Sequence, residues 1–401
     1  MYVTRPLSMY RRSPESLSAP TPEGPNSGYL VLDDEESDDY TCFGCCADTR
    51  VEDLPFPQNK DLSVGYSSDS DEVAFIPVLD KPLSANTYHV VCRDGKHRGE
   101  VCTNSKKENM VDIGWFGRTI GKTVIDVEPK PFDPSDIYQQ IEIIPKQRGY
   151  FTANAVASDG IPPSFLRRKT WPVHMATLPL HYQPLHYQLS NAPGLDASKR
   201  SGLPGFNLPL SQDFSEAMVV GKWHCPFLFI KEEGLKLKHQ MKQCMFYEMR
   251  LEQRWERIFD KYNEGTSSNA NAVFVDTFVQ REAVFIAGNE AFSDNLDRFN
   301  VADDGFMWFK SSDGAGGKMS VGLSMKIVER MKWEQGRVGW VDGEKRKVRV
   351  ERSEKFGGTG GWNRFGCYVL VERFVLKRMD GSLALLTYDF KHTHQIRCKW
   401  E

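Results

Sequence analysis

Residues 362–400, WNRFGCYVLVERFVLKRMDGSLALLTYDFKHTHQIRCKW, decide the fold class of this chain. Two apolar runs rich in β-branched and aromatic residues flank Asp380-Gly381. This dipeptide reverses a chain readily because glycine adopts positive φ. The sequence therefore predicts a long antiparallel hairpin that closes on the C-terminal residue, and no catalytic signature lies near it.

The returning strand of this hairpin carries two different sets of side chains, because side chains alternate across a strand. The apolar or aromatic set comprises Ala384, Leu386, Tyr388, Phe390, His392, His394, Ile396, Cys398 and Trp400. The opposite set, polar after its first member, comprises Leu385, Thr387, Asp389, Lys391, Thr393, Gln395 and Arg397. We expect the first set to face the core, with Trp400 packed, and the second to face water.

Composition places the chain among ordinary globular proteins. With 401 residues it exceeds the length that one core usually fills, which favours two modules. The net charge of −3 gives no overall attraction to nucleic acid or to an anionic membrane. No apolar run reaches the ~18 residues of a transmembrane helix. The N-terminus lacks the apolar region of a secretory signal, so we expect a soluble cytoplasmic or nuclear protein with reduced cysteines; an organelle transit peptide is the alternative.

Changes in composition suggest four segments. Residues 1–27 are rich in Ser, Pro and Arg, should bury little, and are predicted to be flexible. Residues 28–158 form a first β-rich module, 159–215 a Pro- and Gly-rich connector that duplicates LHYQ, and 216–401 a second β-rich module. The expected fold is mainly β, with an α+β tail as the alternative. The second module is expected to be an antiparallel sandwich or stacked sheets.

Individual elements follow from the local pattern. Strands are predicted at 28–32, 73–79, 87–92, 123–129 and 219–232, and again at 272–288 as a pair. A helix is predicted at 133–144, capped by Asp133 or Ser135. The acidic stretches at 33–39 and 67–72 should be exposed loops. Residues 245–255 alternate like a strand, while 254–259 fit a strand or a helix.

Two segments share the pattern M-[RK]-apolar-E-Q, at residues 249–253 and 331–335. Each is followed by basic and aromatic residues and then by a V-x-V strand. The pattern is consistent with an internal repeat of a β unit, and five matching positions are equally consistent with chance.

Motifs associated with ligands each have a structural alternative. The run GWFGRTIGKT at 114–123 ends like a phosphate-binding loop but has Phe116 where that loop requires glycine, and β-type sequence follows it. CFGCC at 42–46 lacks the second ligand pair of a zinc site, so we expect free thiols and no zinc. His392 and His394 would share one strand face, where two hydrogen-bonded core histidines are favoured over a metal site.

The chain resembles a plant family of uncharacterised proteins, domain of unknown function 1262. The resemblance rests on MYVTRPLSMYRRSP, GPNSGYLVL, FIPVLDKPLSANTYHVV, VVGKWHCPFLFIKE, MFYEMRLEQRWE, FGCYVLVERFVLKRMDGS and LTYDFKHTHQIRCKWE, with further matches between them. Members are sometimes labelled insecticidal crystal toxin domains, which we treat as a transferred name. The resemblance implies a plant source, an intracellular location and a link to stress or defence; it carries no catalytic residue.

We therefore expect a non-enzymatic binding or scaffold protein with a protein partner and no cofactor. One alternative is a lipid- or glycan-binding β module, and another is an enzyme whose site no motif reveals. Trp308, Trp333, Trp340 and Trp362 are candidates for an aromatic binding groove, together with His392 and His394, although tryptophan is commonly a core residue.

Overall fold

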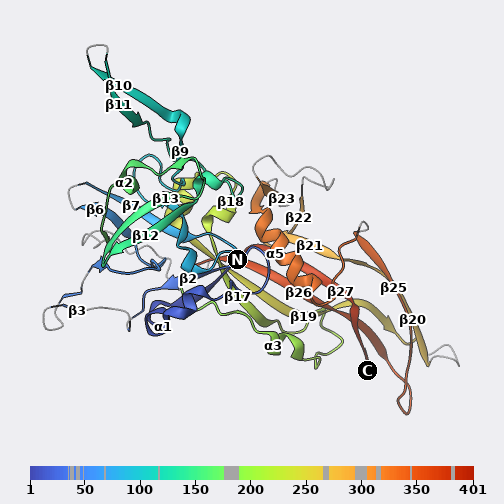
Figure 1. The fold of residues 1–401 in the computed structure, drawn as a ribbon. Helices are drawn as coiled ribbons and strands as arrows, with labels where there is room; N and C mark the ends of the chain where they lie inside the picture. The colour runs from blue at the N-terminus through green and yellow to red at the C-terminus, as the bar shows by residue number, and fades with distance from the viewer. Residues whose placement is uncertain are drawn as a thin grey trace.

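In the computed structural model the chain is mainly β, as the sequence predicted. The structure describes residues 1–401 except 35, 37–39, 42–45, 48, 67–68, 116–117, 176–188, 265–270, 294–304, 313–317, 344–345 and 381–383. Two large sheets carry most of the described strands (Figure 1). The CFGCC run and the LHYQ duplication lie largely or wholly outside the described residues.

The larger sheet has twelve strands and holds both ends of the chain. Its order is β18 (Ile230–Glu232), β24 (Lys318–Ser324), β23 (Phe306–Ser312), β22 (Asn289–Ser293), β21 (Glu282–Ile286), β27 (Ala384–Trp400), β26 (Arg364–Arg378), β19 (Phe246–Tyr262), β17 (Met218–Pro226), β1 (Tyr2–Pro6) and β2 (Gly28–Leu32), with β16 (Gly194–Leu195) beside β17. Its pairs are antiparallel except β1 with β2.

The smaller sheet is an antiparallel array built from the N-terminal half. Its order is β13 (Tyr150–Ala155), β12 (Ile141–Gln147), β8 (Thr87–Cys92), β7 (Asp69–Pro77), β6 (Leu62–Tyr66), β15 (Val173–Met175) and β5 (Arg50–Val51). A separate aromatic core, with Phe56, Phe75, Tyr88, Phe151 and Trp171, lies against it.

Short ribbons and helices complete the described structure. The ribbons are β3 (Tyr40–Thr41) with β4 (Cys46–Ala47), β9 (Ser105–Lys106) with β14 (Gly160–Ile161), β10 (Met110–Trp115) with β11 (Arg118–Val124), and β20 (Ala272–Gln280) with β25 (Lys347–Lys355). The α-helices are α1 (Leu7–Arg12), α2 (Ser164–Arg167), α3 (Ala197–Gly202), α4 (Leu237–Gln243) and α5 (Met325–Gly336). Figure 1 shows the β10–β11 and β20–β25 ribbons projecting at opposite ends of the molecule.

The N-terminal residues contradict the expectation that they bury little. Met1, Tyr2 and Val3 are buried, and β1 pairs with both β2 and β17. The Tyr2 hydroxyl also donates to the Pro77 carbonyl at 2.7 Å. Low overall hydrophobicity concealed a short apolar strand, so composition averaged over 27 residues was misleading here.

The proposed repeat is wrong. Residues 249–253 lie in strand β19, whereas residues 331–335 lie in helix α5. The helix buries Ile327, Val328 and Met331 against the larger sheet, at the three- and four-residue spacing of a helical face. Strand β19 continues to Tyr262, so residues 254–259, for which the sequence left strand and helix open, are a strand.

Several loop and helix predictions in the N-terminal half are also wrong. Residues 137–139 form a 3₁₀ turn capped by Asp136, and strand β12 follows where a helix was expected. Residues 69–72 belong to β7, and β11 ends at Val124 instead of continuing to 129. The segment 159–215 contains α2, β15, β16 and α3. Leu166 and Trp171 of this segment pack in the core of the smaller sheet, and Leu189 packs in the core of the larger sheet.

The terminal hairpin is confirmed as β26 and β27, but the face assignment holds only in part. Leu386, Tyr388, Phe390 and His392 are buried, as expected. A bulge then shifts the register of β27: Leu370 pairs with His392, but its neighbour Val369 pairs with Ile396. His394 lies between these two pairs and is exposed. Asp389, expected to face water, is buried against Arg373 with contacts of 2.5 and 2.6 Å.

Candidate functional site

A buried ionic network joins three segments that are far apart in sequence. Arg200 on α3 donates from Nε and Nη2 to the two carboxylate oxygens of Glu372 on β26, at 2.8 and 2.5 Å. Its Nη1 donates to Glu334 Oε1 on α5 at 2.6 Å. All three residues are at most 5% exposed. The network therefore attaches the connector segment to both the sheet and the helix that covers it.

Further arginines balance the charge of this network. Arg330 Nη1 donates to Glu334 Oε2 at 2.7 Å, one helical turn away on α5. Arg337 reaches Glu334 at 3.5 Å and Glu23 at 2.8 Å. The network thus pairs three guanidinium groups with three carboxylates, and these ion pairs carry no net charge. The groups are those of Arg200, Arg330 and Arg337, and of Glu23, Glu334 and Glu372.

The protonation states of the two titratable groups beside Arg200 are fixed well away from neutral pH. Burial alone would raise the pKa of Glu372, but the hydrogen bonds and charge of Arg200 outweigh it and leave that pKa lowered. Burial lowers the pKa of His392 to about 4, against the opposing charge of Glu372. At pH 7 the carboxylate is therefore ionised and the imidazole is neutral.

A cavity of about 290 Å³ opens beside this network. Its lining residues are Leu195, Ala197, Arg200, Ser201, Leu203, Gln253, Arg337, Val338, Leu370, Glu372, His392 and Gln395. We refer to it as the Arg200 cavity. Ala197 and Ser201 are exposed residues of α3, so one wall of the cavity borders solvent.

Two residues that line the Arg200 cavity each carry a buried acceptor atom with no hydrogen-bond partner among the described residues. Gln253 donates from Nε2 to Glu372 at 2.8 Å and to the Arg200 carbonyl at 3.1 Å, which leaves its Oε1 unpartnered. The His392 Nε2–H donates to Gln335 Oε1 at 2.9 Å, so its unpartnered Nδ1 carries a lone pair. Both residues are 1% exposed. A group that donates hydrogen bonds would satisfy both atoms.

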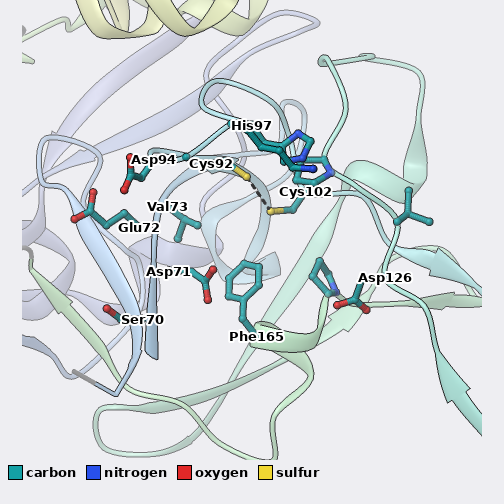
Figure 2. Close-up of a pocket in the computed structure, with 15 residues that line it drawn as sticks. Ser70, Asp71, Glu72, Val73, Cys92, Asp94, His97, Cys102, Asp126 and Phe165 are labelled. Atoms are coloured by element: carbon teal, nitrogen blue, oxygen red, sulfur yellow. Dashed lines mark hydrogen bonds between the residues drawn. The ribbon is translucent and has the colours of Figure 1, made fainter. Parts of the chain in front are cut away.

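A second cavity, of about 540 Å³, lies on the smaller sheet (Figure 2). We call it the thiol pocket. Strand β7 supplies Asp71 and Glu72, the end of β8 supplies Cys92, and the turn after it supplies Asp94, Lys96 and His97, while Cys102, Asp126 and Phe165 come from later segments. Four of the lining side chains are carboxylates, which makes the pocket predominantly acidic.

The two thiols of this pocket face one another. Figure 2 shows the Cys92 and Cys102 sulfur atoms pointing toward each other. They lie 3.7 Å apart. Asp126, on the opposite wall, accepts from Arg167 at 3.0 Å and from the Ser164 amide at 2.8 Å. His97 Nδ1 contacts Glu100 at 2.5 Å.

The predicted tryptophan candidates lie in separate environments. Trp340 packs in the core 5.0 Å from the Phe390 ring, and Trp362 lies 5.1 Å from the Trp400 ring. Trp333 is half-buried between the guanidinium groups of Arg330 and Arg337, at 4.6 and 4.9 Å from its ring. Trp308 is half-buried on β23 beside Gly322.

Of the two candidate histidines, the structure brings only His392 to the Arg200 cavity. His394 is exposed within the bulge, with its ring 5.5 Å from that of His392. Sequence reasoning missed Arg200, Glu334, Glu372 and Gln253, because a network of single residues from four segments leaves no local pattern. It also missed the thiol pair, although the Asp94-Gly95 turn signal between Cys92 and Cys102 predicts that the flanking segments meet.

In the described part of the chain, no three His, Cys, Asp or Glu side chains are grouped as a bound metal ion requires. None of the helices in that part is long and apolar enough to cross a bilayer.

Comparisons with known proteins identify a family model and structural neighbours. Residues 23–115 match the model described as "Protein of unknown function (DUF1262)", so the resemblance to domain of unknown function 1262 is confirmed over that part. The chain is also similar to a structure titled "Crystal structure of Cry35Ab1", with 11% identity, a TM-score of 0.43, and coverage of 86% of this chain and 90% of that one. The comparison with curated proteins gives no match.

Proposed function

We propose that this chain is a non-enzymatic binding protein that holds a small, neutral, hydroxyl-rich molecule in the Arg200 cavity. The proposal places it inside the cell, in the cytoplasm or nucleus, and in a plant, with a role in stress or defence. Compartment and source rest on the sequence and the family resemblance, whereas the ligand class rests on the cavity.

The observation that carries the proposal is the pair of unpartnered acceptors, Gln253 Oε1 and His392 Nδ1, which belong to two residues that line the same cavity. A buried acceptor without a partner costs roughly 1–3 kcal/mol, so such atoms are normally bound to water or to a ligand. Hydroxyl groups donate to both types of acceptor, and a polyol or sugar supplies several of them from one small ring.

Charge balance favours a neutral ligand over an ion. Each arginine of the network already contacts a carboxylate, and Glu372 is fully engaged by Arg200 and Gln253. An added anion or cation would be buried beside a balanced network with no opposite charge of its own, which is strongly unfavourable.

The lowered pKa values of Glu372 and His392 favour binding over catalysis. A general acid or base works best when its pKa lies near the working pH. Here the carboxylate keeps its charge and the imidazole, with a pKa of about 4, stays neutral throughout the physiological range. These residues can orient a ligand, but they are poorly suited to exchange protons with it.

Calorimetric titration of the full-length chain tests this function. The probes are neutral monosaccharides and cyclic polyols, with a uronic acid and an amino sugar as charged comparisons. We expect saturable binding of at least one neutral probe and weaker binding of the charged ones. The variant Ala197→Phe places a ring at the wall of the cavity and should abolish binding.

The matched control is Ser198→Phe, on the next residue of α3, which is exposed and does not line the cavity. It should bind like the unaltered chain. Absence of saturable binding for every neutral probe would refute the proposal, as would equal binding by the two phenylalanine variants.

A further inference from the structure

We propose that Cys92 and Cys102 form a reversible disulfide by exchange with a small-molecule disulfide that enters the thiol pocket. Disulfides with amine groups should be preferred over anionic ones. This inference is independent of the Arg200 cavity.

The backbone holds the two cysteines on adjacent antiparallel segments. Val91 and Val101 form a bridge, the Cys92 amide donates to the Glu100 carbonyl at 3.0 Å, and the Cys102 amide donates to the Val90 carbonyl at 2.8 Å. This register puts the two cysteines diagonally across one face. Their sulfur atoms, 3.7 Å apart, need to approach by less than about 2 Å to reach the ~2.05 Å of a disulfide bond.

The pocket gives a reagent access to one thiol and not to the other. Cys92 is half-buried at the end of β8, whereas Cys102 is 2% exposed. Both line the same cavity of about 540 Å³, which has room for a small disulfide. Cys92 is therefore the attacking thiol, and Cys102 is the thiol that resolves the mixed disulfide.

The hydrogen bond between the thiols favours the same assignment. The hydrogen bond with Cys102 lowers the pKa of Cys92, although burial and the charges of Glu100 and Asp71 oppose the shift. The same hydrogen bond, together with burial, raises the pKa of Cys102. The more accessible thiol is thus also the one that ionises first, and the thiolate is the reactive form.

A second pair of cysteines in the chain shows the opposite arrangement. Cys367 and Cys398 lie directly opposite each other on β26 and β27. Hydrogen bonding lowers the pKa of Cys367, but that thiol is fully buried. The accessible Cys398 has a raised pKa, because its thiol is the donor and is partly buried. This pair is an internal control for reactivity.

The exchange is balanced in atoms and electrons. The Cys92 thiolate attacks one sulfur of the small disulfide and releases one small thiol. The Cys102 thiolate then attacks the Cys92 sulfur of the mixed disulfide and releases the second small thiol. The protein loses two electrons and two protons, and the small disulfide gains them.

The pocket carboxylates should select the reagent by charge. Asp71, Glu72, Asp94 and Asp126 line the cavity, with Lys96 as the lysine among them. Cystamine, which carries two ammonium groups, should therefore react faster than oxidised glutathione, and added salt should narrow the difference.

The experiment uses the reduced full-length chain with cystamine near neutral pH, followed by alkylation and peptide mapping. Mapping separates the pair from the other cysteines, including Cys42, Cys45 and Cys46. We expect a Cys92–Cys102 linkage that a dithiol reductant reverses. Cys102→Ser should retain a stable cysteamine adduct on Cys92, and Cys92→Ser should leave Cys102 unmodified.

The double variant Cys367→Ser/Cys398→Ser should form the Cys92–Cys102 linkage at the unaltered rate. The proposal is overturned if the reduced wild-type chain yields no such linkage. It is also overturned if Cys102→Ser accumulates no adduct on Cys92 while its melting temperature is unchanged, or if oxidised glutathione reacts as fast as cystamine at low salt.

Discussion

Arg200 and Glu372 form a bidentate ion pair across 172 residues of sequence, with contacts of 2.8 and 2.5 Å between two side chains that are each at most 5% exposed. Arg200 lies on a helix of six residues in a Pro-rich segment, and Glu372 lies on a central strand of the larger sheet. The pair therefore couples the path of that segment to the cavity we propose as the ligand site.

Replacing Arg200 with methionine should destabilise the chain strongly. The change leaves Glu372 without its guanidinium partner and leaves Glu334 with fewer donors, and removing one partner of a buried pair costs roughly 3–5 kcal/mol. Chemical denaturation measures the loss. Lys199→Ala, an exposed neighbour on α3, should change stability by no more than about 0.5 kcal/mol; equal effects for both would contradict the account.

Acidification from about pH 6.5 to 4 should reduce stability because of three buried histidines. Burial lowers the pKa of His89, His224 and His392 to about 4 in each case. Their ordinary value is 6.5, so between these limits the unfolded chain binds protons that the folded chain does not. The stabilisation is complete above pH 6.5 and is lost as the pH falls toward 4.

His224 gives the sharpest test of this pH dependence. Neither ring nitrogen has a partner among the described residues, and the side chain is fully buried. His224→Phe should flatten the fall in unfolding free energy between pH 6.5 and 4 by up to ~3 kcal/mol. The exposed His239→Asn control should leave it intact. An unchanged slope in His224→Phe would show that this histidine is protonated in the folded state.

Gly24→Ala should weaken the attachment of the N-terminal segment to α5. Gly24 has φ of +103°, and a Cβ there would lie 2.5 Å from the Trp333 ring and 2.8 Å from the Arg330 guanidinium. Backbone strain and this clash together should cost ~1–3 kcal/mol. Gly202→Ala, where a Cβ meets nothing within 4 Å, is the control. Similar melting temperatures for both variants would argue against the packing described here.

Trp400→Ala should destabilise the end of the terminal hairpin. The Trp400 ring lies 4.4 Å from Phe365 and 5.1 Å from Trp362, although it is only half-buried. We expect a loss of roughly 2–4 kcal/mol, somewhat below that of a fully buried aromatic. Thermal melts with the exposed Lys355→Ala as control measure it, and an unchanged melting point would mean that the chain end is frayed.

Lys391→Ala, at a position that the sequence predicted to face water, should have a measurable effect on stability. Lys391 is half-buried and forms an ion pair with Glu256 on β19. The expected loss is about 0.5–1 kcal/mol, which salt should reduce. Denaturation at low and high ionic strength measures the loss. A loss below about 0.3 kcal/mol at low salt, in the range of the weakest ion pairs, would contradict this prediction.

The strands of the terminal hairpin were predictable because their apolar runs and turn signal are local. The burial of Asp389 and the exposure of His394 were not predictable. Asp389 is buried because β27 lies between β21 and β26, where Arg373 covers it, and His394 is exposed because a bulge breaks the two-residue period. Both facts depend on neighbours that the sequence of the strand does not specify.

Helix α5 shows that a segment of five residues is too short to distinguish a helix from a strand. Met331, Trp333 and Gln335 fit a strand as well as a helix when residues 331–335 are considered alone. The helix becomes evident only when Ile327, Val328 and Met331 are considered together, since these form its buried face. The Arg200 cavity lies beyond such reasoning, because its lining residues come from segments that meet only in the folded chain.

Ligand binding in the Arg200 cavity is tested most directly by ¹⁵N NMR of the histidine-labelled full-length chain. His392, assigned with His392→Asn, is followed while the tightest neutral sugar or polyol is titrated in. We predict that the His392 Nδ1 resonance shifts saturably as the lone pair accepts a hydrogen bond, while His224 does not move. No shift at His392 under saturating ligand would contradict the account.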